Sequence, residues 1–200
     1  MAVDPIAFCM QRLPELYAEL FPQLASELQQ ALRERTLSGT VTFAGEGGTT
    51  LALIADAEGL QVRKGETAEE GFGYALELPL SAASFGLDEI ERERLLKSGM
   101  LRVMQLLPSS QARQLLAQGY VFDATVKEVP VLGEVRARVA LGKSRLPARC
   151  EFSLEVTYDD LEDAREEGVA PHQFFLAGKM KMDGDVAKAM MLGMTLAQFR

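Results

Sequence analysis

The sequence lacks most of the side chains on which enzyme and metal chemistry depends. It has one histidine, two cysteines and no tryptophan. Zinc motifs that need two histidines are therefore excluded, and a serine or cysteine nucleophile would have to use His172 as its base. No GxSxG nucleophile motif is present. We interpret His172 as a solvated residue at a helix start, and we expect no catalytic residue, no metal site and no cofactor.

Positive charge is also scarce, with 21 Lys and Arg against 29 Asp and Glu and a net charge of −8. Nucleic acid is not an expected partner, because phosphate neutralisation needs a basic face. The sequence has no uncharged apolar run of about 18 residues that could span a membrane, and its start lacks the basic region of a signal peptide. Cys9 and Cys150 form no CxxC pair, and we interpret them as buried, reduced thiols. These features favour a cytoplasmic protein.

Residues 1–35 are predicted to be an N-terminal helical segment. Pro5, Pro14 and Pro22 divide it, and because proline suits the first turn of a helix we expect two or three short helices. Residues 36–200 are predicted to form one α+β domain.

In that domain, alternating apolar and polar side chains predict antiparallel strands with one solvated face. Strands are expected at 40–43, 50–54, 59–64, 74–80, 120–126, 135–141, 150–158 and 178–182. Helices are expected at 84–97, 159–167, and from 108, 171 and 185, with a short apolar run at 100–107. The predicted fold is a mixed, largely antiparallel sheet with helices on one face.

The two halves of this domain share short stretches of pattern. Residues 74–78 match 152–156 at an offset of 78, and residues 95–99 match 174–178 at an offset of 79. One explanation is an old duplication, with degenerate halves at 36–118 and 119–200. The other is generic strand–helix–glycine patterning, and the sequence leaves both open.

The most distinctive motif is the closing segment, residues 174–192, FFLAGKMKMDGDVAKAMML. It resembles the end of the sterol carrier protein type 2 (sterol-binding) domain family, in which an aromatic-rich turn precedes Gly-Lys-hydrophobic-Lys-hydrophobic, Gly-Asp and an apolar helix. The matching positions are Gly178, Lys179, Met180, Lys181, Met182, Gly184, Asp185 and Ala189. The resemblance is clearest over residues 150–195 and implies a sterol carrier-like α+β fold and non-catalytic lipid binding.

The closing segment also has the composition of an apolar binding surface. Five of the nine methionines lie between Met180 and Met194, and from Val186 to Leu196 the only polar side chains are Lys188 and Thr195. A helix that is apolar nearly all round should bury both faces. The sheet can cover one face, and a second layer, a partner chain or an apolar ligand the other. Methionine suits surfaces that accept varied apolar shapes, although it also fills ordinary cores.

We therefore predict binding or carriage of a sterol, fatty acid or acyl-CoA in an apolar cavity between the sheet and the C-terminal helix. The expected ligand-binding residues are apolar residues of the last strands and helices: Phe152, Leu154, Phe174, Phe175, Met180, Met182, Met190, Met191 and Met194. The alternative is a protein-interaction or homodimerisation module that uses the apolar helix and binds no ligand.

One basic stretch interrupts the acidic chain, since residues 135–149 hold five basic residues and no acidic one. Arg136 and Arg138 share a face of a predicted strand. The ordinary interpretation is a solvated sheet face paired with acidic neighbours. The functional interpretation is attraction to an anionic membrane surface.

Overall fold

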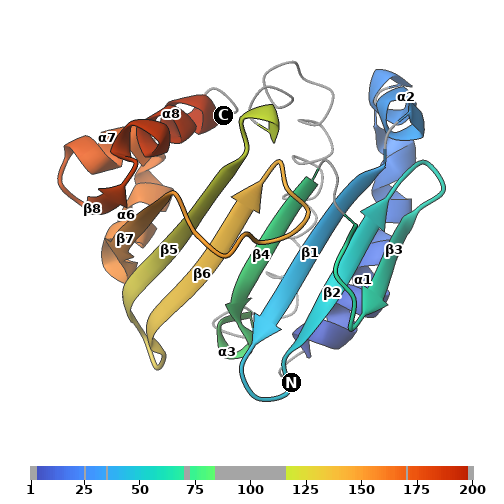
Figure 1. Cartoon of the computed structure of the whole chain (residues 1–200), viewed down its shortest axis with the longest axis horizontal. Coiled ribbons are helices and arrows are strands. Elements are labelled where there is room, and N and C mark those ends of the chain that lie inside the picture. The colour runs from blue at the N-terminus through green and yellow to red at the C-terminus, as the bar shows by residue number, and fades with distance from the viewer. Residues whose placement is uncertain are drawn as a thin grey trace.

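A mixed sheet organises the computed structural model, which describes residues 4–24, 26–34, 36–69, 73–83, 116–169 and 171–197. Within these residues the strand order is β3-β2-β1-β4-β6-β5-β7-β8 (Figure 1). The strands are β1 (Leu37–Ala44), β2 (Thr49–Ala55), β3 (Leu60–Lys64), β4 (Gly73–Pro79), β5 (Tyr120–Val129), β6 (Gly133–Leu141), β7 (Phe152–Thr157) and β8 (Met180–Gly184). The expected helices at 84–97 and from 108, and the apolar run at 100–107, lie outside the described residues.

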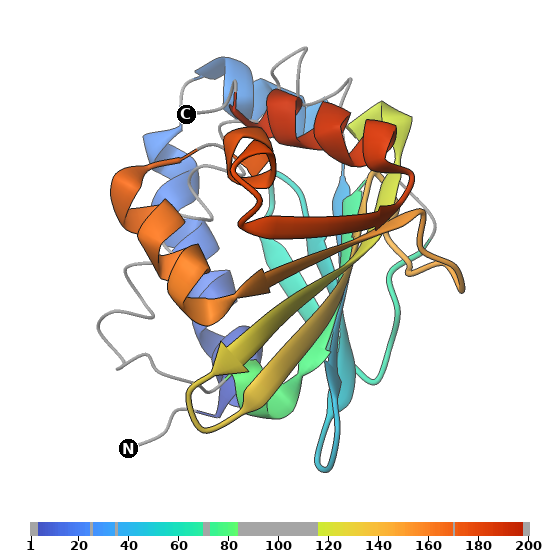
Figure 2. The ribbon, with the colours of Figure 1, turned by 90° about the vertical axis from the view of Figure 1, so that its left-hand side faces the viewer.

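The pairing confirms the predicted fold class. β1 with β4 and β5 with β7 are parallel, and the other five neighbouring pairs are antiparallel. The helices are α1 (Pro5–Leu20), the 3-10 turn η1 (Phe21–Gln23), α2 (Ser26–Glu34), α3 (Leu80–Ala83), α6 (Tyr158–Glu167), α7 (Pro171–Leu176) and α8 (Val186–Ala197). Figure 2 shows α1, α6, α7 and α8 on one side of the sheet. We call the sheet face on that side the inner face.

The expected division of the N-terminal segment at Pro14 was wrong. Asp4 caps α1 by accepting a hydrogen bond from the Ile6 N–H at 2.9 Å, and the helix then runs through Pro14 to Leu20. Proline removes one helical hydrogen bond, and burial of the apolar side of α1 outweighs that loss. The helix ends just before Pro22, as the proline pattern predicted.

Strand register makes the inner face apolar from one strand to the next. One row crosses five strands and consists of Val41, Leu76, Val139, Phe122 and Phe152. The rings of Phe122 and Phe152 stack with centroids 5.2 Å apart. Because side chains alternate across a strand, this face must be covered while the other face can meet water.

Helix α1 covers the inner face over β1, β2 and β3. Ile6 and Leu13 of the helix pack against Phe43, Leu51 and Leu53 of the strands. A second buried cluster continues from the end of α1 through α2 to β2. Its members are Tyr17, Leu20, Leu24, Leu32 and Ala55. The first part of the sheet is thus closed by its own N-terminal helices.

On the opposite, outer face, loops and ion pairs replace helices. Ala75, Val121 and Ala140 are buried with Leu146 of the loop after β6 against them. That loop is tied to the loop before β4, since Ser144 Oγ donates to the Glu69 carbonyl and Arg145 Nε donates to the Ala68 carbonyl at 2.8 Å.

The two arginines of the basic stretch pair with acidic residues on this outer face. Arg138 donates to both carboxylate oxygens of Asp123 at 2.7 and 3.1 Å, and this lowers the pKa of Asp123. Arg136 donates to Glu134 at 3.3 Å. These contacts favour the interpretation of a solvated, charge-paired sheet face.

The same local topology occurs twice in the sheet. β2 and β4 flank β1 with antiparallel and parallel pairing, and β6 and β7 flank β5 in the same way. We call β1, β2 and β4 the first set of strands and β5, β6 and β7 the second set. The sequence match of residues 74–78 to 152–156 falls on β4 and β7, which occupy the same place in the two sets. The sets meet where β4 pairs with β6.

The expectation that both cysteines are buried was wrong for Cys150. Both thiols are free, but Cys9 is half-buried in α1 and Cys150 is exposed. Burial, with a smaller contribution from Asp4, raises the pKa of Cys9 to about 11. The interpretation of Cys150 failed because β7 begins only at Phe152, so the predicted alternation does not extend to it.

Gly39 provides a test of this packing, because it lies opposite Tyr74 on the inner face. A Cβ atom at Gly39 would lie 2.8 Å from Tyr74 Cζ. We expect Gly39→Val to displace the ring and lower the free energy of unfolding by about 1–3 kcal/mol in urea titrations. The loss should shrink in a Tyr74→Ala background, where the obstructing ring is absent. Equal losses in both backgrounds would contradict this account.

Candidate functional site

The closing segment has local signals that set each of its turns. Thr157 caps α6 by accepting a hydrogen bond from the Asp160 N–H at 3.2 Å, and Gly168 ends that helix with φ +65°. Gly178, with φ +72°, occupies a turn. Because of this turn, β8 begins at Met180, two residues later than expected. Asp185 caps the last helix, since its Oδ1 accepts from the Lys188 N–H at 2.9 Å after Gly184 turns with φ +87°.

One side of α8 packs closely on the inner face of the sheet. Ala189 and Leu192 are buried in a cluster with Tyr120 and Phe152. Half-buried residues around this cluster come from neighbouring strands: Phe122, Leu141, Leu154 and Met182. This contact joins the closing helix to β5 and β7.

The structure distributes the nine predicted binding residues among four environments. Phe152, Leu154 and Met182 belong to the α8 cluster. Phe174 is buried, with Lys179 Nζ 5.9 Å from its ring centroid. The half-buried residues are Phe175, Met180 and Met190.

Met191 and Met194 differ from the rest, because each is 47% exposed. In this chain by itself, the side of α8 that holds these two methionines lacks the second cover that its apolar sequence predicts. The sheet covers the side that holds Ala189 and Leu192, while Met191 and Met194 project from it.

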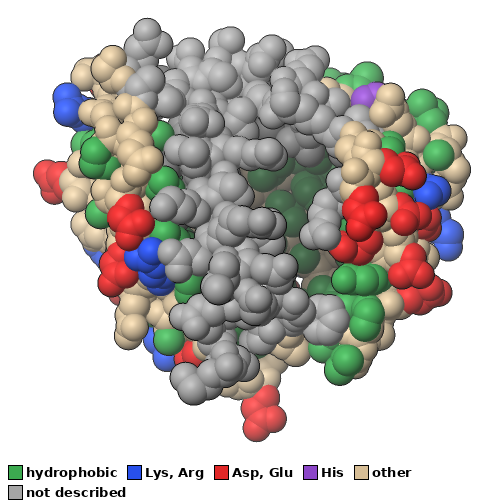
Figure 3. Space-filling view, turned by 180° about the vertical axis from the view of Figure 1, so that it is seen from behind, with side chains coloured by type: hydrophobic (Ala, Val, Ile, Leu, Met, Phe, Trp, Pro, Cys, Tyr) green, Lys and Arg blue, Asp and Glu red, His purple; other side chains and the backbone are tan. Residues whose placement is uncertain are grey.

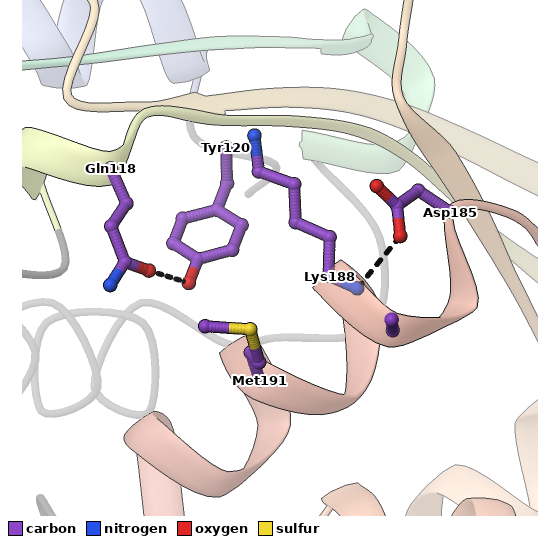
Figure 4. A pocket seen from close by; sticks show the side chains of 6 residues that line it. Gln118, Tyr120, Asp185, Lys188 and Met191 are labelled. Carbon is purple, nitrogen blue, oxygen red and sulfur yellow. Dashed lines mark hydrogen bonds between the residues drawn. The ribbon is translucent and has the colours of Figure 1, made fainter.

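A shallow pocket of about 350 Å³ lies where the start of α8 meets the start of β5. Its lining residues are Gln118, Tyr120, Asp185, Ala187, Lys188 and Met191 (Figure 4). Of these, sequence reasoning selected only Met191 as a binding residue. Lys188 was noticeable as one of two polar residues on an apolar helix, but its partners come from distant parts of the chain.

Lys188 ties α8 to the sheet beside this pocket. Its Nζ donates to Glu151 Oε1 at 2.6 Å and to the Gly119 carbonyl at 3.0 Å, and it lies 5.3 Å from the Tyr120 ring centroid. The other Glu151 oxygen accepts from the Val121 N–H at 3.0 Å. Partial burial acts to raise the pKa of Glu151, but the hydrogen bonds from Lys188 and Val121 outweigh it and the pKa is lowered.

The middle of the inner face is the second candidate site. Seven apolar residues of β4, β5, β6 and β7 are half-buried there: Leu76, Ala124, Val126, Val135, Ala137, Val139 and Val156. Figure 3 shows a hollow with a hydrophobic floor on this side of the molecule. Ala124 and Ala137 are directly paired, and their small side chains leave room above the sheet. The sequence placed these positions on strands, but not in the site.

The described part of the chain supports neither a metal site nor a membrane-spanning helix. No cluster of three or more His, Cys, Asp or Glu suited to a metal ion occurs there. None of the described helices has both the length and the apolar character needed to cross a bilayer.

Comparison with known families agrees with this architecture. Residues 105–197 match the model of the SCP-2 sterol transfer family, so this part of the chain is similar to that family. The resemblance expected from the closing segment is thereby confirmed. Comparisons with curated proteins and with solved structures found no match.

The tie between Lys188 and Glu151 predicts a pH dependence. Because the folded-state pKa of Glu151 is lowered, its contribution to stability is full above the unfolded-state pKa of about 4.3 and is lost as pH falls through the lower folded-state value. We expect the Glu151→Gln variant to have a lower melting temperature than the wild type at neutral pH. The difference in melting temperature should shrink below about pH 4. Glu58→Gln, in an exposed turn, controls for removal of a carboxylate. If the melting temperature of Glu151→Gln stays below that of the wild type by the same amount from pH 7 to 3, the prediction is wrong.

Proposed function

We propose that the protein binds and carries a lipid-like molecule, such as a sterol, fatty acid or acyl-CoA, without catalysing a reaction. The observation that carries the proposal is the half-buried apolar centre of the inner face, above which the surface is hollowed (Figure 3). An apolar floor of this kind holds a ligand mainly by removing apolar area from water. The family of residues 105–197 supports the same function.

The expected energetics suit reversible carriage. Burying about 400 Å² of apolar ligand surface contributes ~10 kcal/mol. Micromolar affinity needs about 8 kcal/mol, and immobilising the ligand consumes several kcal/mol. The remainder is below about 8 kcal/mol, so we expect an affinity weaker than micromolar and ready exchange of the ligand.

We place the ligand over the second set of strands. The first set is closed by α1, whose Ile6 and Leu13 fill the space over β1 and β2. The domain is accordingly proposed to consist of two degenerate halves with divided roles, one packed by the N-terminal helices and one retaining the binding face. The repeated strand pairing and the extent of the family match support this division.

A non-catalytic role is supported by the state of the polar groups. The expectation of a solvated His172 was wrong. This second residue of the short helix α7 is half-buried, and its Nδ1 is buried without a hydrogen-bond partner among the described residues. The ion pairs of Arg138 with Asp123 and of Lys188 with Glu151 use polar groups for structure. Because Arg136 and Arg138 are paired with acids, we do not include an anionic membrane surface in the proposal.

Filling the hollow tests the proposal. We expect the wild type to take up a fluorescent lipid probe in a one-to-one complex that long-chain lipids displace. Ala124→Phe and Ala137→Phe should each weaken uptake at least about tenfold, because one ring occupies the volume of several ligand carbons. The measurements are probe titration and melting temperature for each variant.

Ser153→Phe is the matched control, since Ser153 lies on the outer face of β7 next to the same strands. It should leave uptake unchanged. Wild-type uptake no greater than that of an unrelated acidic protein, or full uptake by folded Ala124→Phe and Ala137→Phe, would refute the proposal.

The alternative, an interaction module without a ligand, rests on the exposed Met191 and Met194. Native mass spectrometry of protein purified from cells separates the two functions. A co-purifying lipid mass supports carriage, whereas a bare dimer that Met191→Lys with Met194→Lys dissociates supports the module.

A further inference from the structure

The turn between β5 and β6 holds an aliphatic residue in a strained conformation. Val131 has φ +68°, and the Leu132 N–H donates to the Pro130 carbonyl at 2.8 Å, which closes a γ-turn around Val131. This φ is unusual for a β-branched residue, and a γ-turn of this hand is strained. Glu128, at a bulge in β5, has φ +60°. Apart from these two, the described residues with positive φ are all glycines.

The turn between β1 and β2 shows that this fold can form a hairpin without such strain. β1 and β5 run in the same direction, so the turns that follow them both lie at the lower end of the sheet in Figure 1. In the β1–β2 turn, Gly45 and Gly47 take the positive φ values, +105° and +73°, and Glu46 lies between them. Glycine adopts such values without steric cost. A valine in this conformation therefore points to a function of its side chain.

The strained residue is also the most exposed large apolar residue in the described part of the chain. Val131 is 98% exposed, Pro130 beside it is exposed and Leu132 is half-buried. We call these three residues the hairpin tip. The ends of β5 and β6 next to the tip carry two basic and two acidic residues, which are Lys127, Glu128, Glu134 and Arg136. An apolar tip thus projects beyond strand ends whose charges balance.

The backbone of the hairpin tip suits an apolar environment. Pro130 has no N–H group, and the N–H of Leu132 is bonded within the γ-turn. The Glu134 N–H donates to the Leu132 carbonyl at 2.9 Å. A backbone N–H without a partner costs free energy when it leaves water. The hydrogen bonds inside the turn lower this cost and leave the apolar side chains to face the surroundings.

We propose that the hairpin tip inserts into the surface of a lipid bilayer without net charge, with Val131 foremost and the charged strand ends at the level of the head groups. The balanced charges next to the tip, and the net charge of −8 of the chain, favour lipids without net charge over anionic ones. The inference goes beyond the proposed function, because this contact requires no ligand in the hollow.

The size of the tip favours a bilayer over a protein partner. A specific protein interface buries about 800 Å² on each partner and involves about 20–30 residues of each. Three side chains at the end of a hairpin supply much less. A bilayer needs no complementary shape, and each aliphatic side chain that enters it strengthens the association by leaving water.

A tryptophan reporter tests insertion directly. The sequence contains no tryptophan, so a single introduced indole reports only its own surroundings. In Val131→Trp, vesicles of phosphatidylcholine should shift the emission to shorter wavelength, and lipids with brominated acyl chains should quench it. Glu46→Trp is the matched control, because it places the same reporter in the other turn at the same end of the sheet. Its emission should not respond to vesicles.

Variants without tryptophan complete the test, because an indole by itself favours membrane surfaces. In flotation with the same vesicles, the wild type and Val131→Ile should both bind. Val131→Gly should bind about tenfold more weakly or less, because the inserted side chain is absent. Its melting temperature should not fall, because glycine accepts the positive φ. A side chain that served only folding would give the reverse, a lower melting temperature with unchanged flotation.

The outcomes separate this proposal from carriage of a lipid. Insertion of the reporter at position 131 together with weaker flotation of Val131→Gly supports it. An emission of Val131→Trp that vesicles do not change, or equal flotation of the wild type and Val131→Gly, overturns it. Self-association that Val131→Gly abolishes, without binding to vesicles, also overturns it and assigns the tip to a contact between copies of the chain.

Uptake of the fluorescent lipid probe is measured on the same variants. Val131→Gly should take up the probe as the wild type does, because the tip lies outside the floor of the hollow. If uptake is absent while the tip still inserts, carriage is overturned and the bilayer contact stands.

Discussion

The structure depends on one constraint, which is the removal from water of an apolar sheet face that extends across both sets of strands. Register aligns Val41, Leu76, Val139, Phe122 and Phe152 in a single row. The antiparallel pairing of β4 with β6 joins the sets, so the halves share one inner face. Every described α-helix longer than ten residues has buried apolar residues that pack on this face.

The two halves meet this constraint differently. Over β1, β2 and β3 the cover is continuous, because α1 supplies Ile6 and Leu13 and the following turn extends the core through Leu24 and Leu32. Over β5 and β7 the cover includes α8, which buries Ala189 and Leu192 but leaves neighbouring apolar residues half-buried. This sheet face, which the described helices bury incompletely, is the physical basis of the proposed binding of an apolar molecule.

Charge is distributed so that it does not compete with this apolar surface. The outer face holds cross-strand pairs such as Arg138 with Asp123 and Lys181 with Glu155. Lys188 reaches from α8 to Glu151 at the margin of the sheet. Acidic residues gather on α6, where Asp159 and Asp160 also complement the positive end of the helix.

Sequence alone determined the local structure of this protein. Period-two alternation located the strands, and Gly184 with Asp185 defined the start of α8, because such signals depend on neighbours in the chain. The closing motif also indicated the similarity to the sterol carrier family that residues 105–197 show. Long-range geometry was beyond that reasoning. The contacts of Lys188 with Glu151 and Gly119 join residues 37 and 69 positions apart, and no local pattern encodes them.

Which side of α8 meets the sheet was equally undetermined, since a helix apolar nearly all round has no preferred side by sequence. Only packing against Tyr120 and Phe152 decided that Leu192 is buried and Met191 and Met194 are not. Only the register of β5 with β6 brought Ala124 and Ala137 together on the inner face.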